Sequence, residues 1–211
     1  MNKSIFDRDC RACGRLAGFL DEVQQRYPDY YCGPVPPFGD ADARFLIVGL
    51  APGMHGANRT GRPFTGDHAG IMLYQMLHKY GFSSKPESLG ADDSLRLRHC
   101  RITNAVKCLP PDNKPVGAEI NTCNAFLANE LATLAPGSLV LALGGIAHRA
   151  IIKALQLRQA AFKFAHGALH DLPDFRMLDS YHCSRYNTNT GRLTQPMFES
   201  IFAEAKALLQ S

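Results

Sequence analysis

The chain has 211 residues, 45% of them hydrophobic and 20% charged, which excludes a disordered or fibrous protein and allows a sizeable buried core. No apolar run is long enough to cross a membrane, and the charged N-terminus, MNKSIFDRDC, lacks the apolar core of a signal peptide, so we expect an intracellular protein. The formal net charge of +4 permits nucleic-acid binding without being diagnostic of it. Seven cysteines in such a protein favour metal ligands or reduced thiols over disulfides.

The first half of the chain alternates between predicted helices and strands. An amphipathic helix at about 11–26 precedes a turn-rich connector at 33–40 and a short, fully apolar strand at 45–50. A long glycine-rich loop follows. The next helix begins after Asp67, a residue type that caps helix N-termini, and stops at Gly81.

The second half continues this alternation after a polar insertion at 87–98. Its predicted elements are a strand at 101–107, a helix at about 117–133, a buried strand at 138–145 that runs into a helix, a strand at 175–182 and a C-terminal helix. Strands that alternate with helices imply a mostly parallel sheet covered on both faces. We therefore predict an α/β fold: a three-layer α/β/α arrangement around a four-stranded sheet, as one domain of residues 1–211.

Three irregular loops follow predicted strands, at 49–67, 108–116 and 182–195. In open α/β sheets, ligands bind outside the carboxyl ends of the strands. The loops should therefore open on the same edge of the sheet and form one composite site.

Four cysteines have a spacing typical of metal ligands. Cys10 and Cys13 form a C-x2-C motif, and 14 residues separate Cys108 from Cys123. Four thiolates hold either a zinc ion or an iron–sulfur cluster, and the spacing does not choose between them. The alternative is a set of buried free thiols, which are common in protein cores.

The loop at 49–67, GLAPGMHGANRTGRPFTGD, contains neither a P-loop nor a dinucleotide-binding motif. Its glycines let the backbone approach a ligand closely. Asp67 has two interpretations, as a helix N-cap and as a carboxylate that orients or deprotonates a water molecule. Phe64, taken alone, reads as a core residue.

Two polar residues at strand ends are further candidates. His182 ends the last strand and opens into a polar loop, which is a favourable place for a functional histidine. Asn104 lies within an apolar strand, where its amide must find partners. An amide that donates and accepts suits the edge of a nucleobase, and the alternative is a hydrogen bond to a neighbouring loop.

Three stretches, GLAPGMHGANRTGRPFTGD, TNAVKCLPP and HCSRYNTNTGRLT, together with the four cysteines, resemble the iron–sulfur uracil-DNA glycosylases. The resemblance is closest to the type B branch, also called family five. It covers nearly the whole chain, and the motifs follow the family order, each at the end of a predicted strand. The resemblance implies a structural [4Fe–4S] cluster bound by Cys10, Cys13, Cys108 and Cys123.

The resemblance also implies an activity, hydrolysis of the N-glycosidic bond of a damaged base that is flipped out of the DNA stack. Phe64 would stack on the base, Asn104 would pair with its edge, and backbone N–H groups near Ala51 and Gly53 would contact its oxygens. His182 would stabilise the negative charge that grows on uracil O2. The residues expected to contact DNA are Arg59, Arg62, Ser184, Arg185, Tyr186, Asn187 and Asn189.

One departure from related branches concerns the attacking water. Those branches carry a polar residue early in the first motif, where this chain has only Leu50, Ala51 and Pro52 after Gly49. Asp67 is the nearest carboxylate in the loop, and the type B branch is thought to use the matching aspartate. The alternative is a largely dissociative reaction in which the water needs little help.

The expected protein is therefore a monofunctional glycosylase, without strand cleavage, that acts on uracil and on deaminated purines such as hypoxanthine or xanthine. We expect a monomer in the cytoplasm, associated with the nucleoid, with DNA as its substrate and with clamp-type replication or repair proteins as partners. Two other interpretations are a zinc- or cluster-stabilised DNA-binding module without glycosylase activity and a small iron–sulfur redox protein.

Overall fold

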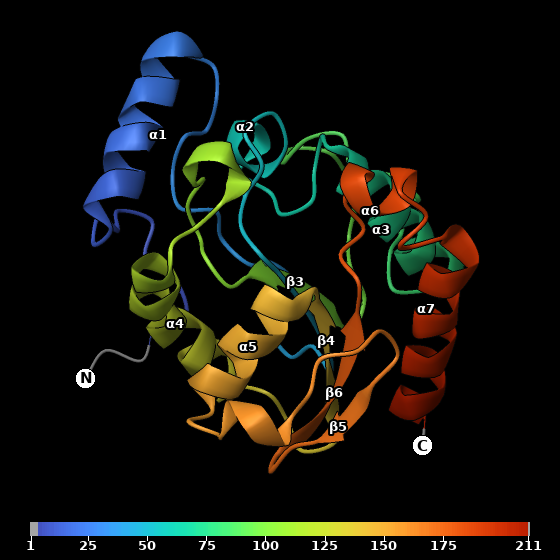
Figure 1. Cartoon of the computed structure of the whole chain (residues 1–211). Coiled ribbons are helices and arrows are strands. Elements are labelled where there is room, and N and C mark those ends of the chain that lie inside the picture. Colours follow the sequence, from blue (N-terminus) through green and yellow to red (C-terminus); the bar gives the residue numbers. More distant parts are fainter. Residues whose placement is uncertain (1–3, 211) are drawn as a thin grey trace.

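The computed structural model describes residues 4–210 and contains one six-stranded sheet with helices on both faces (Figure 1). The strands are β1 (Phe38–Gly39), β2 (Phe45–Gly49), β3 (Cys100–Asn104), β4 (Ser138–Leu143), β5 (Leu169–Asp171) and β6 (Phe175–Ser180). The α-helices are α1 (Gly14–Arg26), α2 (Ala57–Thr60), α3 (His68–Lys79), α4 (Gly117–Leu131), α5 (Gly145–Ala154), α6 (Arg185–Asn189) and α7 (Gln195–Gln210).

The strand order is β1-β3-β2-β4-β6-β5. The inner strands β3, β2, β4 and β6 are parallel, which confirms the mostly parallel sheet, and the short edge strands β1 and β5 run antiparallel. The predicted count of four strands was wrong, because it omitted the two edge strands β1 and β5. At two and three residues, they are too short to show the alternation that marks a strand in the sequence.

The side chains of β2 show how the sheet separates two cores. Phe45 and Ile47 face the apolar cluster that contains residues of α3 and α7, whereas Leu46 and Val48 face the cluster that contains residues of α4 and α5. All five residues of β2 are buried, as expected for a central strand covered on both faces. This arrangement confirms the predicted three-layer α/β/α fold.

The parallel strands bring their carboxyl ends to one edge of the sheet. Gly49, the last residue of β2, lies opposite Asn104, the last residue of β3, in the strand register. The short helices α2 and α6 and the start of α3 gather above this edge (Figure 1). Within residues 4–210, no helix combines the length and the apolar character needed to cross a membrane.

Candidate active site

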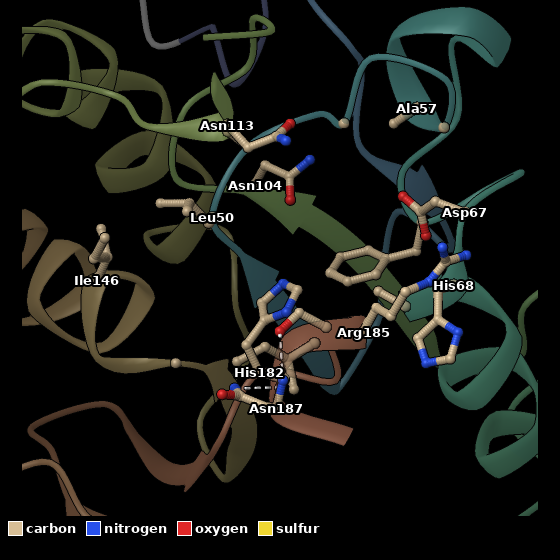
Figure 2. Close-up of a pocket in the computed structure, with 18 of the residues that line it drawn as sticks. Leu50, Ala57, Asp67, His68, Asn104, Asn113, Ile146, His182, Arg185 and Asn187 are labelled. Carbon is tan, nitrogen blue, oxygen red and sulfur yellow. Dashed lines mark hydrogen bonds between the residues drawn. The ribbon is translucent and has the colours of Figure 1, made fainter. Parts of the chain in front are cut away.

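A cavity of about 630 Å³ opens at this edge of the sheet. The loop after β2 contributes Ala51, Gly53, Phe64 and Asp67, the loop after β3 contributes Asn113, and the segment after β6 contributes His182, Ser184, Arg185 and Asn187. Figure 2 shows Asp67, Asn113 and His182 converging from elements that are far apart in the sequence. The predicted composite site is therefore present, with all three loops in its lining.

Gly49 lets two predicted base-binding side chains meet at the cavity. A Cβ atom added to Gly49 would lie 2.5 Å from Asn104 Oδ1 and 2.7 Å from the ring of Phe64, closer than real Cβ atoms approach. Phe64 is only 6% exposed and has a φ of 53°, in the left-handed region that a phenylalanine rarely adopts. The loop thus holds an aromatic face beside an amide in an otherwise unfavourable backbone conformation.

Asn104 presents an unsatisfied acceptor. The residue is 3% exposed, and its Oδ1 atom has no hydrogen-bond partner among the described residues. Leaving a buried acceptor unpaired costs about 1–3 kcal/mol, so such groups call for an explanation. Because Asn104 lines the cavity, a ligand with an N–H group would supply the missing partner.

Asp67 caps α3, as one of its two interpretations predicts. The Gly70 N–H donates to Asp67 Oδ1 at 2.8 Å. The other carboxylate oxygen, Oδ2, faces Gly53 and Gly56, and a Cβ atom on Gly56 would overlap it. Burial raises the pKa of the Asp67 carboxyl above its ordinary value, although hydrogen bonds from the Gly70 and Ala69 backbone oppose this shift. The cap therefore leaves Oδ2 on the cavity side, where it is a stronger base than an exposed aspartate.

His182 lies two residues after Ser180, the last residue of β6, and beside Phe64. The two rings are nearly parallel, at 27°, with centroids 5.8 Å apart. Burial lowers the pKa of His182 to about 4, so the imidazole is neutral at physiological pH. Asn187 fixes the backbone here, because its Nδ2 donates to the His182 carbonyl at 2.8 Å. A neutral imidazole in this position can donate one hydrogen bond to a developing anion.

The loop after His182 forms the short helix α6. Ser184 caps this helix, and its hydroxyl accepts from the Asn187 N–H at 3.4 Å. Arg185 and Asn189 are exposed, and Tyr186 is 72% exposed, which is unusual for a large aromatic side chain. Ser184, Arg185 and Asn187 line the cavity, whereas Tyr186 and Asn189 lie outside its lining.

Arg62 has a different environment from the one predicted. It is 5% exposed, its Nη1 lies 2.6 Å from Asp93 Oδ1, and the same nitrogen donates to Ser88 Oγ at 2.9 Å. Its Nη2 donates to the Ala91 carbonyl at 2.7 Å, and the guanidinium lies 4.3 Å from the ring centroid of Phe38. These contacts fasten the loop at 49–67 to the insertion that follows α3, so the position of Arg62 does not support the predicted phosphate contact.

Arg59 remains available at the surface. It lies in α2, is exposed, and donates from Nε to the His55 carbonyl at 2.9 Å. It does not line the cavity, so any contact with DNA would be made beside the opening.

Sequence reasoning missed several cavity residues, among them His68, Asn113 and Arg192. His68 Nε2 lies 3.0 Å from Thr188 Oγ1 and so connects α3 to α6. Arg192 lies over the ring of Tyr181, with its guanidinium carbon 4.6 Å from the centroid. The position of Asn113 directly after the PPD turn was a usable signal, since that loop follows a strand.

The four candidate ligand cysteines line a second cavity, of about 300 Å³. The pKa of Cys108 is raised to about 12. Burial is the largest cause, and the charges of the three other cysteines and of Glu119 raise this pKa further. The Lys107 N–H donates to Cys123 Sγ at 3.3 Å. Four thiols that face one space are suited to a cation or a metal cluster, which would stabilise the thiolates.

The separation of the thiols bears on the kind of metal. Within residues 4–210, the one group of three or more possible ligand atoms that lie within 4.8 Å of one another is His148, His170 and Asp179. Zinc bonds thiolates at about 2.3 Å in a tetrahedron, which places the sulfurs roughly 3.8 Å apart. Among residues 4–210, no three of the four cysteine sulfurs lie within 4.8 Å of one another.

The fold and the cavity define an α/β protein with a cavity at a sheet edge whose ring of Phe64 and unpaired Asn104 acceptor suit a planar, hydrogen-bonding ligand. Residues 36–206 match the model of the uracil DNA glycosylase superfamily. A type-5 uracil-DNA glycosylase of Thermus thermophilus is 50% identical over 205 residues, which cover 94% of this chain and 93% of that protein. The type-5 enzyme of Pyrobaculum aerophilum is 43% identical over 203 residues, with coverage of 94% and 88%.

A type-4 uracil-DNA glycosylase of Archaeoglobus fulgidus is more distant, at 30% identity over 139 residues, which cover 65% of this chain and 62% of that protein. The chain therefore belongs to the uracil DNA glycosylase superfamily and, within it, to the type-5 family. The resemblance to family five is confirmed.

Proposed function

We propose that this protein is a base-excision repair enzyme that removes uracil from DNA by hydrolysing the N-glycosidic bond. The similarity to type-5 uracil-DNA glycosylases supports the activity. The observation that carries the proposal in this chain is the unpaired, buried Oδ1 of Asn104 beside the ring of Phe64. The N3–H of uracil supplies the donor that this oxygen lacks.

Recognition of the flipped base follows from these neighbours. Phe64 stacks on the base, and Asn104 accepts from N3–H while its amide donates to O4. The backbone near Ala51 and Gly53 contacts the base oxygens. Deaminated purines such as hypoxanthine and xanthine present a similar N–H and C=O edge, and a cavity of about 630 Å³ has room for the larger ring. We therefore include them as substrates.

Bond cleavage leaves the electron pair of the C1′–N1 bond on the base. The neutral His182 donates a hydrogen bond to O2, where this charge accumulates, and one such donor accelerates a reaction by about 10²–10³-fold. Water forms the new bond to C1′, and Asp67 accepts its proton. Within residues 4–210, no lysine lines the cavity, so the enzyme has no amine nucleophile there and should release the base without cutting the strand.

Contacts to the DNA backbone come from the rim of the cavity. Ser184, Arg185, Asn187 and Asn189 lie on or next to α6, and Arg59 lies on α2. Contacts of this kind fix the register of the protein on the strand without reading its sequence. Tyr186, the exposed aromatic side chain of α6, enters the gap that the flipped base leaves in the stack.

We further propose that Cys10, Cys13, Cys108 and Cys123 hold a [4Fe–4S] cluster. The cluster ties the segment before α1 to the β3–α4 connection and to α4, which are distant in the chain. A small cluster of apolar residues adjoins it and includes Cys108, Leu109 and Met54, the last of which also lines the active-site cavity. The role of the iron–sulfur group is therefore structural, and its loss should loosen the loop at 49–67, which contains Met54.

The whole chain, residues 1–211, acts in this proposal as one glycosylase domain and as a monomer. We also propose that the protein works in the cytoplasm, associated with the nucleoid, and that it docks to a clamp-type protein. Size-exclusion chromatography with light scattering tests the monomer.

The central experiment is a base-release panel on duplexes that each carry one lesion. The purified protein with its iron–sulfur cluster bound should release uracil and leave an abasic site with an intact strand. Duplexes with hypoxanthine or xanthine rank the other substrates. If uracil-containing DNA stays intact, the result would favour a DNA-binding module instead. Measurements of iron and acid-labile sulfide on the same preparation distinguish the cluster from zinc.

A further inference from the structure

The short helix α6 at the rim of the cavity has few contacts that hold it in place. None of its residues is buried, so no apolar core fixes it, and an isolated helix of 5 residues is unstable in water. Within residues 4–210, one hydrogen bond joins α6 to a part of the chain outside 182–193, and it connects Thr188 Oγ1 with His68 Nε2 at 3.0 Å. The position of α6 therefore depends on His68.

The direction of this hydrogen bond follows from the second partner of Thr188. The hydroxyl carries one hydrogen, and its Oγ1 lies 3.0 Å from the Arg185 carbonyl oxygen, which can only accept. The hydroxyl therefore donates to Arg185 and accepts from the Nε2–H group of His68. A neutral ring with its hydrogen on Nε2 and a protonated ring both supply this donor, so the contact does not depend on the charge of His68.

His68 lies where the helix capped by the candidate carboxylate meets the helix at the cavity rim. It is the first residue of α3 and directly follows Asp67, which caps that helix. In Figure 2, His68, Asp67 and Arg185 lie together on one side of the cavity. The hydrogen bond to Thr188 thus joins the start of α3 to the helix that carries Arg185 and Tyr186.

We infer that His68 is a positioning residue, which holds α6 at the cavity through Thr188 so that Arg185 and Tyr186 meet the DNA in a fixed place. The inference rests on the proposed glycosylase function. A uracil in a duplex must be unstacked and unpaired before it enters the cavity, and a side chain that fills the gap offsets part of this cost. In single-stranded DNA the base has no pairing partner to leave. Anchoring of α6 should therefore matter more for duplex DNA.

The first test compares single-turnover release of uracil from duplex and single-stranded DNA by the protein with its iron–sulfur cluster bound. We expect His68→Ala to slow release from the duplex by about fivefold, the worth of one net hydrogen bond, and release from the single strand by less than about twofold. His68→Gln should recover most of the lost rate, because its amide nitrogen also donates. Thr188→Val, which lacks the hydroxyl, should match His68→Ala, and Thr188→Ser should match the wild type.

A double variant separates positioning from a direct contact between His68 and DNA, since His68 also lines the cavity. If the two side chains act through one hydrogen bond, His68→Ala combined with Thr188→Val loses no more rate than either single variant. If His68 acts on the DNA itself, the losses of the single variants multiply, or Thr188→Val alone leaves the rate unchanged. Either of these results overturns the inference.

Hydrogen exchange of the free protein tests the anchoring without any reaction. Peptides that cover 183–193 should exchange faster in His68→Ala and Thr188→Val than in the wild type, because a helix without its tertiary contact opens more often, and His68→Gln should restore the slow exchange. Peptides from β4 are the internal control and should not change. Equal exchange at 183–193 in all variants overturns the role of His68, whatever the activity. A wild type that leaves uracil in place, while these variants exchange faster, overturns the glycosylase proposal instead.

Discussion

The charge states of two side chains define the chemistry at the residue scale. Burial lowers the pKa of His182 to about 4 and raises the pKa of Asp67 above its ordinary value. The proposed reaction requires a neutral imidazole that donates to the leaving base and an ionised carboxylate that receives a proton from water. Because His182 stays neutral down to about pH 4, protonation of Asp67 should set the acid limb of the activity.

We expect the single-turnover rate to fall as pH decreases through the raised pKa of Asp67. Asp67→Asn keeps a good helix cap but has no base, so it should lower the rate by about 10²-fold or more and flatten the acid limb. His182→Ala should lower the rate at least about tenfold at every pH, and its rate should still fall as the pH decreases. The measurement is single-turnover base release between about pH 4 and pH 8, with thermal unfolding as a control for the cap. If the rate of Asp67→Asn still falls at acid pH, Asp67 is not the group that accepts the proton of the water.

Arg62 illustrates how far position along the chain can mislead. Its location in a glycine-rich loop next to Arg59 indicates phosphate binding, but its partner Asp93 lies 31 residues further on and takes the side chain into the interior. Asp67, by contrast, was recognisable as a cap, since a cap depends only on residues within one turn. The left-handed backbone of Asn113 gave no sequence signal, because asparagine occupies many turns without it.

Arg62→Met should therefore act on stability rather than on DNA affinity. Removing one partner of a buried ion pair leaves the other uncompensated, which costs about 3 kcal/mol. Asp93 has a pKa lowered to about 2 despite partial burial, through hydrogen bonds from Arg62 and the Leu89 and Leu95 backbone, so it would be left charged. Urea denaturation measures the loss. Arg59→Met, on the exposed side of the same loop, is the matched control and should unfold like the wild type.

At the scale of elements, a second buried pair joins α5 to β6 just below the site. His148 Nδ1 lies 2.8 Å from Asp179 Oδ1, and His148 Nε2 lies 3.0 Å from the Phe162 carbonyl. Both ring nitrogens face acceptors, so the ring is best satisfied as an imidazolium. His170 on β5 reaches the other oxygen of Asp179 at 2.9 Å. Asp179, three residues before His182, thus anchors the end of β6 that leads to this histidine.

This pair predicts a pH-dependent contribution to stability. Burial lowers the pKa of His148, but the hydrogen bond and charge of Asp179 outweigh it, so the pKa is raised overall. A raised histidine pKa stabilises the fold fully below the unfolded value of about 6.5, and this contribution is lost as pH rises through the folded value. The stability difference between wild type and His148→Asn should be about 3 kcal/mol near pH 6 and shrink toward pH 9.

Chemical denaturation across that pH range measures the difference. His99→Asn is the control, because His99 is exposed and has a left-handed φ that asparagine tolerates. A difference for His148→Asn that stays constant with pH would show that the ring contributes by packing rather than by charge.

The sheet connects these parts at the scale of the whole molecule. Because β2, β3 and β6 are parallel, three loops that are far apart in the sequence open on one edge, and this much followed from the order of the predicted elements. The short edge strands and the pairing of distant charges depend on contacts formed only in the folded chain. A net charge of +4 is modest, so attraction to DNA must come from where the cations lie rather than from their sum.

That placement gives a prediction for the salt dependence of DNA binding. Arg185 is exposed at the cavity rim, and neutralising one phosphate steepens the plot of log affinity against log salt by about 0.9. Arg185→Ala should therefore reduce the slope by about one and weaken binding to all sequences alike. Arg158 is also exposed but follows Ala154, the last residue of α5, whereas Gly145 at the other end of this helix lines the cavity. Arg158→Ala removes the same charge and serves as the control. The slopes are measured by fluorescence anisotropy on an abasic-site duplex. An equal change of slope in both variants would mean that overall charge, rather than the rim of the cavity, draws DNA to the protein.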